Sequence, residues 1–315
     1  HRLTLDTSFT GKDKLRTRLR TGNFGSSAFS GQGNNLTSLD TASKTSDEVT
    51  IDRLFYKFPV GKEVTFIVGP MARNTESLAM WPSKYNKGGA KILDFFAVAG
   101  VPGVYNKETG SLIAAYWKQK VAKGDPAFSI SANYVADDGE GNDSNPTTGG
   151  IMTDNSNGNI LAQIGWGNGQ YGAAAAYRYG QCGSGMRRMT DYIKDSDVLD
   201  CSTGHNSNSR SSNSFALNGY WQPEETGFIP SVSVGWAINT INGENIADGE
   251  YTTSQSWFTG LKWDDVFIDG NDLGFAFGQP TFATALKGDS DPDDGNYAFE
   301  LYYNYKVTDN ITVTP

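Results

Sequence analysis

The sequence contains few of the residues that metal centres and nucleophilic catalysis require. Its 315 residues include two cysteines, Cys182 and Cys201, and two histidines, His1 and His205. A metal site would need more ligands than these, and the two histidines lie far apart in the sequence. Neither histidine fits a Ser-His-Asp set, because His1 is at the terminus and His205 lies in a polar stretch bounded by the cysteines. We therefore expect no metal, no cofactor and no enzymatic activity.

The two cysteines predict a disulfide instead. Cys182 and Cys201 stand on either side of a polar stretch. An even number of cysteines in a protein outside the cytosol is typical of a loop closed by a disulfide.

Long apolar runs are also missing, so the sequence offers no transmembrane helix. The mean hydropathy is −0.46, although aromatic residues make up 12% of the chain and 37 residues are glycine. This composition favours β-structure. The formal charge of −9 argues against a nucleic-acid partner, which would need a basic face.

Apolar and polar residues alternate along many short segments, which is the two-residue repeat of a β-strand. In the segment 128–134, for example, apolar or aromatic residues alternate with Ser129, Ser131 and Asn133. No stripe with the 3.6-residue period of a helix competes with this pattern. The alternation predicts strands at residues 2–9, 14–23, 49–58, 63–70, 111–121, 126–136, 159–167, 170–180, 213–222, 230–239, 253–263, 271–278, 296–307 and 310–315.

The connections between these strands alternate strictly between short and long. The short ones are rich in turn-forming residues, and they cover residues 11–13, 59–62, 122–125, 168–169, 223–227, 264–270 and 308–310. The long ones cover residues 24–48, 71–110, 137–158, 181–212, 240–252 and 279–295. In an up-and-down sheet, all short turns then lie at one end and all long loops at the other, which is the pattern of outer-membrane barrels with short periplasmic turns and long extracellular loops.

A soluble β-sandwich or barrel is the alternative, since it also contains regular short strands. Two features favour the membrane. Most predicted strands approach the ~9–11 residues that a tilted span requires. Aromatic residues also gather towards strand ends, where the membrane interface would lie; they are Trp117, Tyr134, Trp166, Tyr171, Tyr179, Trp221, Trp236 and Trp263. The sequence thus predicts an all-β, antiparallel up-and-down transmembrane β-barrel with fourteen visible strands.

Four segments resemble the cyanobacterial outer-membrane porins of the OprB-type, carbohydrate-selective porin family. The first is LDTSFTGKDKLRTRL at residues 5–19, and the last is YNYKVTDNITVTP at residues 303–315. Between them, FYKFPVG at residues 55–61 and Gly88-Gly89-Ala90 are also similar. The first and last matches are the most specific, because ordered runs of this length seldom arise from β-composition alone.

The resemblance implies a sixteen-stranded barrel in the outer membrane, usually a homotrimer, that passes small solutes passively. Cyanobacterial members typically carry an S-layer-homology domain before the barrel, which grips the peptidoglycan cell wall. We interpret residues 1–315 as a single barrel domain, truncated at both ends, from which that domain and the closing strand are absent. The last predicted strand, 310–315, is too short to span a bilayer.

In a porin, the polar half of each alternation faces the lumen and sets selectivity. On the second, third and fifth predicted strands these positions carry basic residues, which predicts a basic ladder along one wall. The predicted ladder consists of Arg16, Arg18, Arg20, Arg53, Lys57, Lys118 and Lys120. The alternative is that loop carboxylates pair these charges and leave little net field.

The loop 71–110 is predicted to fold into the bore. It combines charged residues, namely Arg73, Glu76, Lys84, Lys87, Lys91 and Asp94, with apolar Leu93, Phe95 and Phe96. A long loop with such apolar residues is not expected to float in water. We predict that Phe95 and Phe96 fix it to a wall or to a neighbouring subunit while its charges, Arg73 among them, narrow the channel. The alternative is an extracellular lid.

These features predict a porin for passive diffusion of small hydrophilic solutes, such as inorganic ions, sugars or iron species. The alternative is a non-conducting barrel that anchors the envelope or serves as a surface receptor. The basic wall would favour anions, whereas the acidic loops at the mouth would gather cations, so composition leaves the ion preference open. For a sugar track, Tyr220 and Tyr302 are the mid-strand aromatics expected to face inward.

Overall fold

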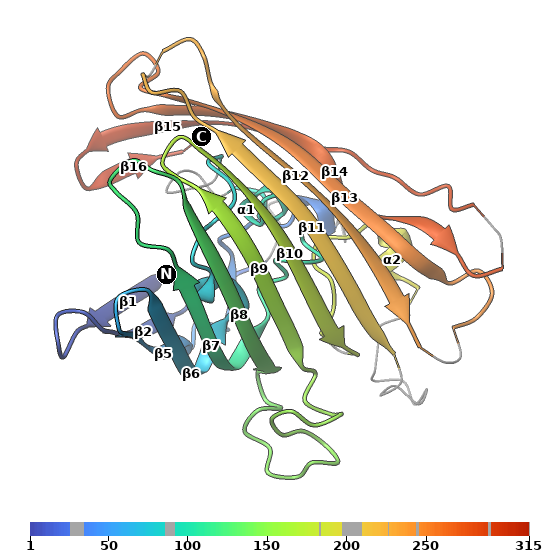
Figure 1. Cartoon of the computed structure of the whole chain (residues 1–315). Helices are drawn as coiled ribbons and strands as arrows, with labels where there is room; N and C mark the ends of the chain where they lie inside the picture. Colours follow the sequence, from blue (N-terminus) through green and yellow to red (C-terminus); the bar gives the residue numbers. More distant parts are fainter. Residues whose placement is uncertain are drawn as a thin grey trace.

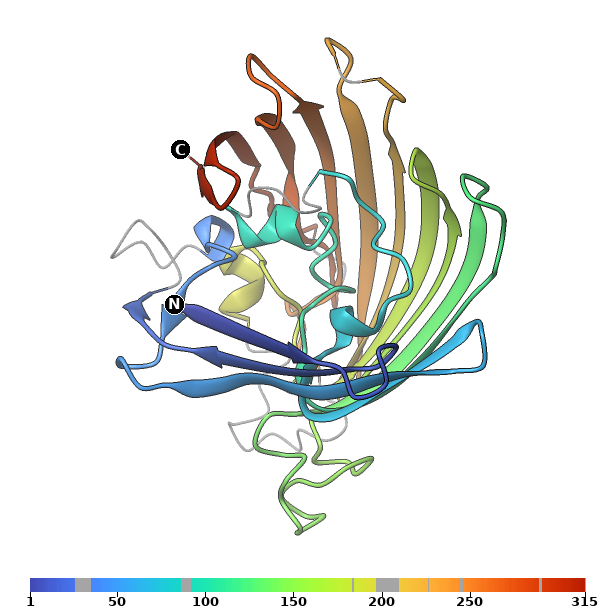
Figure 2. The same cartoon turned by 90° about the vertical axis from the view of Figure 1, so that its left-hand side faces the viewer.

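Fourteen strands form one antiparallel sheet, in which each strand pairs with the next along the chain. The computed structural model describes residues 1–25, 35–85, 92–182, 184–196, 210–225, 227–243, 246–288 and 291–314. The strands are β1 (Arg2–Thr7), β2 (Lys14–Arg20), β5 (Thr50–Val60), β6 (Val64–Arg73), β7 (Thr109–Lys118), β8 (Ala127–Asp137), β9 (Asn159–Gly167), β10 (Tyr171–Gln181), β11 (Ser211–Trp221), β12 (Ser231–Asn242), β13 (Tyr251–Asp264), β14 (Asp272–Leu286), β15 (Ala298–Thr308) and β16 (Ile311–Val313). The sheet curls around an interior, as Figures 1 and 2 show.

The shorter elements lie in the long loops. They are β3 (Asn23–Phe24), which pairs with β4 (Ser43–Lys44), the 3-10 turns η1 (Asn35–Thr37) and η2 (Asn74–Ser77), and the helices α1 (Asp94–Ala97) and α2 (Asp191–Lys194). None of the helices in the described ranges has the length and apolar character needed to cross a bilayer.

The alternation of exposed and buried side chains shows which face of the sheet is the outer one and which is the inner one. On β8, Ile130 is 51% exposed while its neighbours Ser129 and Ser131 are 3% and 2% exposed. The same holds on β9, where Ile164 is 59% exposed and Gln163 is buried. On these strands the outer face is therefore apolar and the inner face polar, which inverts the arrangement of a soluble protein and suits a wall surrounded by lipid.

All fourteen predicted strands are present, but some end elsewhere. The largest difference is at β14, which continues to Leu286 although the prediction ended it at 278, before Pro280. The pairing of β13 with β14 is shifted in register between Gln255 and Trp257, so Pro280 falls where no regular ladder bond is lost. Trp236 is a second correction, because it lies in the middle of β12, opposite Trp257, rather than at a strand end.

The two outermost strands of the sheet are β1 and β16, and within the described residues they do not pair with each other. Figure 2 shows these two edges on the same side of the curled sheet, with the N-terminus beside one and the C-terminus beside the other.

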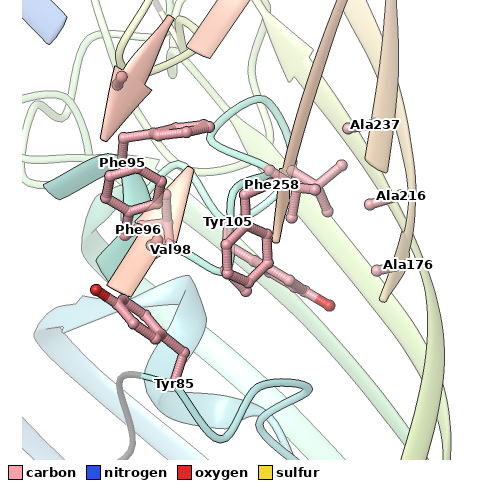
Figure 3. Packing of buried hydrophobic residues seen from close by; sticks show 14 of the residues in the cluster. Tyr85, Phe95, Phe96, Val98, Tyr105, Ala176, Ala216, Ala237 and Phe258 are labelled. Carbon is pink, nitrogen blue, oxygen red and sulfur yellow. The ribbon is translucent and has the colours of Figure 1, made fainter. Parts of the chain in front are cut away.

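The segment between β6 and β7 folds into the interior, where it packs on the inner face of the wall (Figure 3). Its apolar side chains there are Tyr85, Phe95, Phe96, Val98, Val101, Val104 and Tyr105. The wall opposes them mostly with small residues, including Ala176, Ala216 and Ala237, and with Phe258. Burying each large side chain contributes about 1.5–3 kcal/mol.

Close approach of this segment to the wall depends on Gly100. Its φ of +68° is a left-handed conformation, and a Cβ at this position would lie 2.3 Å from Cδ1 of Phe258. Any other residue would therefore be strained and would also displace the Phe258 ring.

Candidate functional site

The N-terminal strands carry basic side chains on the inner face of the wall. Lys57 lies opposite Ile67, which is 1% exposed, whereas the adjacent Phe66 and Val68 are exposed on the outer face. Because side chains alternate along a strand, Arg53 and Lys57 point inward together. Pairing with β5 then places the β2 arginines on the same face: Arg18 lies opposite Arg53, and Arg16 and Arg20 are two residues to either side of Arg18.

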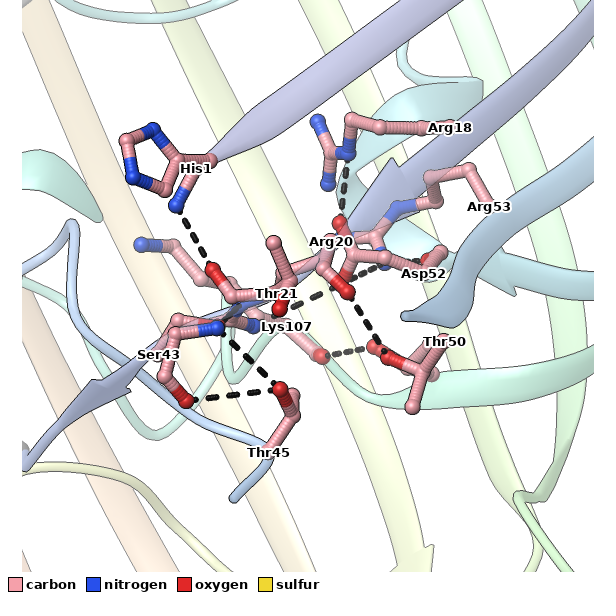
Figure 4. Close-up of polar contacts among 12 residues, drawn as sticks. His1, Arg18, Arg20, Thr21, Ser43, Thr45, Thr50, Asp52, Arg53 and Lys107 are labelled. Atoms are coloured by element: carbon pink, nitrogen blue, oxygen red, sulfur yellow. Dashed lines mark hydrogen bonds and ion pairs between the residues drawn. The ribbon is translucent and has the colours of Figure 1, made fainter. Parts of the chain in front are cut away.

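These arginines share few carboxylates, as Figure 4 shows in part. A register shift in the β2–β5 pairing leaves Asp52 without a partner in β2. Its carboxylate accepts a hydrogen bond from Arg18 and lies 3.4 Å from Arg20 and 3.3 Å from Arg53. One carboxylate is thus shared by three guanidinium groups.

Two further ion pairs complete the N-terminal wall. Arg16 forms a pair with Asp6 on β1, at 2.6 Å. Arg53, which is 1% exposed, also binds Glu76 of η2, at 2.9 Å between Nε and Oε2. The second pair joins the wall to the start of the loop 71–110.

The remaining predicted site residues lie in different environments. Arg73, at the end of β6, is electrostatically repelled by Arg53 and Arg187. Lys57 places Nζ 4.8 Å from the centre of the Tyr116 ring. Lys118 lies opposite inward-facing Ser129 and so faces the interior, while Lys120 lies in the turn after β7. Lys87 and Lys91 lie outside the described residues.

The buried carboxylate of Asp94 binds three cationic side chains at the long-loop end of the interior. Its Oδ1 accepts a hydrogen bond from Lys107, and its Oδ2 accepts from Nε of Arg187 at 2.7 Å and of Arg188 at 2.6 Å. Lys107 also donates to Asp40. Asp94 is 0% exposed, so all of its charge is compensated by these neighbours rather than by water.

The electrostatic environment fixes the charge state of this cluster. Burial by itself would raise the pKa of Asp94, but Lys107, Arg187 and Arg188 outweigh it and hold that pKa below its usual range. Burial lowers the pKa of Lys107, against the opposing effect of Asp94 and Asp40. A depressed carboxyl pKa means that the contacts of Asp94 are complete near neutral pH and weaken only in strong acid.

The Asp94 cluster ties three loops together. The backbone N–H of Asp94 donates to the carbonyl of Ser38 at 2.9 Å, and that of Arg187 donates to the carbonyl of Pro102 at 3.2 Å. The Arg187 side chain remains 34% exposed. The sequence did not predict the roles of Asp40, Lys107, Arg187 and Arg188, because their only shared signal is charge in loops far apart in sequence.

Two residues of the wall hold the loop at Lys84, Tyr85 and Leu93. Ser233 Oγ accepts hydrogen bonds from the backbone of Lys84 at 2.8 Å and of Tyr85 at 3.2 Å. Glu300 accepts from Tyr85 Oη at 2.8 Å and from the backbone of Leu93 at 2.6 Å. These bonds fix the loop on both sides of residues 86–91, which lie outside the described residues.

Of the two tyrosines expected to face inward, Tyr302 is covered. It is 1% exposed, its ring lies 5.7 Å from that of Tyr85, and its hydroxyl donates to the Tyr85 carbonyl at 3.2 Å. Tyr220 borders a cavity at the short-turn end of the interior. A sugar track made of both rings is therefore wrong, because the loop occupies one of them.

We expect Glu300→Gln to loosen the loop. The amide offers one acceptor oxygen to two buried donors, Tyr85 Oη and the Leu93 N–H, and an unsatisfied buried donor costs about 1–3 kcal/mol. Hydrogen exchange of the backbone amides at 93–101 should then be about tenfold faster or more. The exposed Glu225→Gln serves as the matched control. Unchanged exchange in Glu300→Gln would show that Glu300 does not hold the loop.

The disulfide prediction is supported at one end. Cys182 is 5% exposed and disulfide-bonded, and the sequence has only one other cysteine. Cys201 lies outside the described residues, so its place in the pair stays a prediction. In the described part of the chain, no group of three or more His, Cys, Asp or Glu side chains could hold a metal ion.

Comparison with known families identifies the class of protein. The family model described as "Carbohydrate-selective porin, OprB family" matches residues 1–315, so the chain belongs to this family. It is an outer-membrane protein.

Its curated relatives include uncharacterized proteins of two cyanobacteria, one from Nostoc sp. (26% identical) and one from Synechocystis sp. (25% identical). Both matches cover 100% of this chain but only 55% and 58% of the relatives, so the chain spans a little over half of their length.

Solved structures confirm the fold. Pseudomonas putida OprB, solved at high pH, superposes with a TM-score of 0.57 at 13% identity, covering 97% of this chain and 77% of that one. Salmonella typhi OmpF, in complex with daunomycin, superposes with a TM-score of 0.52 at 12% identity, covering 99% and 79%. The fold is thus that of outer-membrane porin barrels.

Proposed function

We propose that this chain forms the channel of an outer-membrane porin, through which small hydrophilic solutes diffuse passively, and that its inner basic wall favours small anions. The observation that carries the proposal is the wall of arginines around Asp52. Arg16, Arg18, Arg20 and Arg53 of this wall face three carboxylates, Asp6, Asp52 and Glu76, and the side chains of Arg16 and Arg20 remain 25% and 22% exposed. Water therefore reaches a surface with excess positive charge, and a poorly screened charge acts strongly on ions that pass it.

The loop 71–110 would constrict this channel. Its apolar residues cover the inner face from β9 to β15, which leaves the N-terminal wall of β1, β2 and β5 as the part that permeating ions meet. The narrow path would then run between the arginines of that wall and the Asp94 cluster on the loop.

Neutralising the arginines that face the interior should change the ion preference. In the variant Arg16→Gln/Arg18→Gln/Arg20→Gln, we expect the chloride-to-potassium permeability ratio to fall on the order of threefold or more, since three charges leave a weakly screened wall. The measurement is the reversal potential of single channels in a planar bilayer under a potassium chloride gradient.

Two controls accompany this test. Asp52→Asn removes the carboxylate at the same wall and should shift the reversal potential in the opposite direction. Lys12→Gln, in the exposed turn after β1, should leave it unchanged. A channel with clear cation preference in the wild type would contradict the anion proposal, and a barrel without conductance would favour the alternative of an anchor or receptor.

The finer properties rest on the family. We infer a homotrimer with outer-membrane lipid around it, contact with the peptidoglycan cell wall through an N-terminal domain, and closure of the barrel by strands beyond β1 and β16. We infer that inorganic ions permeate the channel. Liposome swelling with solutes of graded size would rank sugars and iron species as further permeants.

A further inference from the structure

A cavity of about 780 Å³ opens at the short-turn end of the interior. The turns after β5, β7 and β9 form its rim, and residues 79–81 with Lys84 from the loop 71–110 close its inner end. It lies on the lumen side of the wall, because inward-facing Ser129 and Tyr116 line it. We call it the turn-side vestibule.

Four lysines line the turn-side vestibule: Lys62, Lys84, Lys118 and Lys120. Lys62, Lys118 and Lys120 are exposed. Among the described residues, neither Lys62 nor Lys118 forms a salt bridge. Their ammonium groups are thus available to a ligand.

The carboxylates at the rim cancel only part of this charge. Glu63 accepts hydrogen bonds from the backbone N–H of Lys120 at 2.8 Å and from the indole N–H of Trp117 at 3.1 Å. Both bonds lower the pKa of Glu63 and keep it ionised, and its charge also interacts with that of Lys120. Asp125 is the other carboxylate of the lining, so two carboxylates lie among the exposed ammonium groups of Lys62, Lys118 and Lys120.

The inner end of the vestibule adds a cation over an aromatic ring. Nζ of Lys84 lies 5.0 Å from the centre of the Tyr220 ring, and the Tyr220 hydroxyl donates to the carbonyl of Asn168 at 2.7 Å. The ring is therefore held in place, and both Lys84 and Tyr220 belong to the cavity lining. Lysine ammonium groups arranged in this way act as point charges for oxyanions.

We propose that the turn-side vestibule is a binding site for small inorganic oxyanions, at which anions collect at the short-turn mouth of the channel. The proposal rests on the proposed function and deepens it, because it names a second anion site besides the arginine wall. The opposite mouth is acidic, with Asp138, Glu140 and Asp143 in one long loop and Asp291, Asp293 and Asp294 in another. The two mouths therefore attract ions of opposite sign, and the channel is electrically asymmetric.

The first test measures this asymmetry. On one inserted channel, the anion-to-cation permeability ratio is measured with the salt gradient in each direction. Screening is weaker in dilute salt, so the mouth that faces the dilute side dominates the preference. We expect a higher ratio in one direction for the wild type. In Lys62→Gln/Lys118→Gln/Lys120→Gln this higher ratio should fall about twofold or more, with little change in the lower one.

The second test needs no conductance. Binding of inorganic phosphate to the full chain in detergent micelles is followed by broadening of the phosphorus NMR signal. We expect the triple variant to bind phosphate about tenfold more weakly than the wild type, since three exposed charges are lost. The matched control is Lys12→Gln/Lys123→Gln, which removes exposed lysines from turns at the same end but outside the vestibule.

The outcomes separate this proposal from the porin function itself. If the wild type does not conduct, the proposed porin function is wrong, and phosphate binding alone decides whether the vestibule is an anion site. If it conducts and responds to the arginine substitutions, but the triple variant matches the wild type in both tests, the vestibule is not an anion site. Loss of phosphate binding in the Lys12/Lys123 control would also overturn the proposal, because any surface lysine would then suffice.

Discussion

Asp94→Asn is expected to release the loops that narrow the channel. The substitution leaves Lys107, Arg187 and Arg188 close together without the carboxylate that all three bind, and removing one partner from a buried ion pair typically costs about 3–5 kcal/mol. The remaining like charges repel one another, so the three loops should separate. Single-channel recordings should show a larger and noisier conductance, together with a stronger anion preference.

A matched variant distinguishes loop release from a general loss of folding. Asp309→Asn removes an exposed carboxylate from the short turn after β15, where it pairs with Lys306 at 3.0 Å, and it should leave conductance unchanged. Heat-modifiable mobility on gels reports whether the barrel wall is intact in both variants. An intact Asp94→Asn barrel with wild-type conductance and selectivity would show that the cluster does not bear on the ion path.

Phe95→Ala/Phe96→Ala is expected to detach the loop from the wall. Both side chains are almost completely buried, at 0% and 1% exposed, and they pack together with Tyr85 and Phe258 in the interior. Truncating a buried phenylalanine costs about 3–5 kcal/mol. We expect the conductance to rise several-fold and swelling assays to admit larger sugars, because the loop no longer occupies the interior.

The control for this variant is Phe299→Ala on β15. This side chain is 72% exposed on the outer face, so its loss removes the same atoms without changing the interior. If the double variant inserts as an intact barrel and conducts like the wild type, the loop does not constrict the channel.

The strands could be predicted from the sequence because their signal is local. The alternation of single residues, as in Ser129, Ile130 and Ser131, determines which side chains face inward and which face outward. Each short turn also contains its own turn-forming residues. The inward direction of Arg16, Arg18 and Arg53 followed from the same rule. The prediction failed at β14, which was expected to end at residue 278, whereas an irregular pairing with β13 allows the strand to continue past Pro280.

The contacts of the interior could not be predicted, because they join residues distant in sequence. Nothing local to Asp94 indicates that Arg187 and Arg188 meet it. The run Ala173 to Ala176 could have indicated where the loop packs. Another part of the chain can approach closely at small inward-facing residues such as Ala176. Phe95 and Phe96 indicated that the loop needs an apolar partner, but not which wall supplies it.

The bonds that hold the loop also determine when the channel reaches its final width. Neighbouring strands pair in chain order, so each hairpin can be added after closing only a short stretch of chain. The loop, in contrast, depends on Ser233, which follows Lys84 by 149 residues, and on Glu300, which follows Leu93 by 207. Its docking on Glu300 therefore requires β15, so the loop contacts that narrow the interior are completed only after most of the wall has paired.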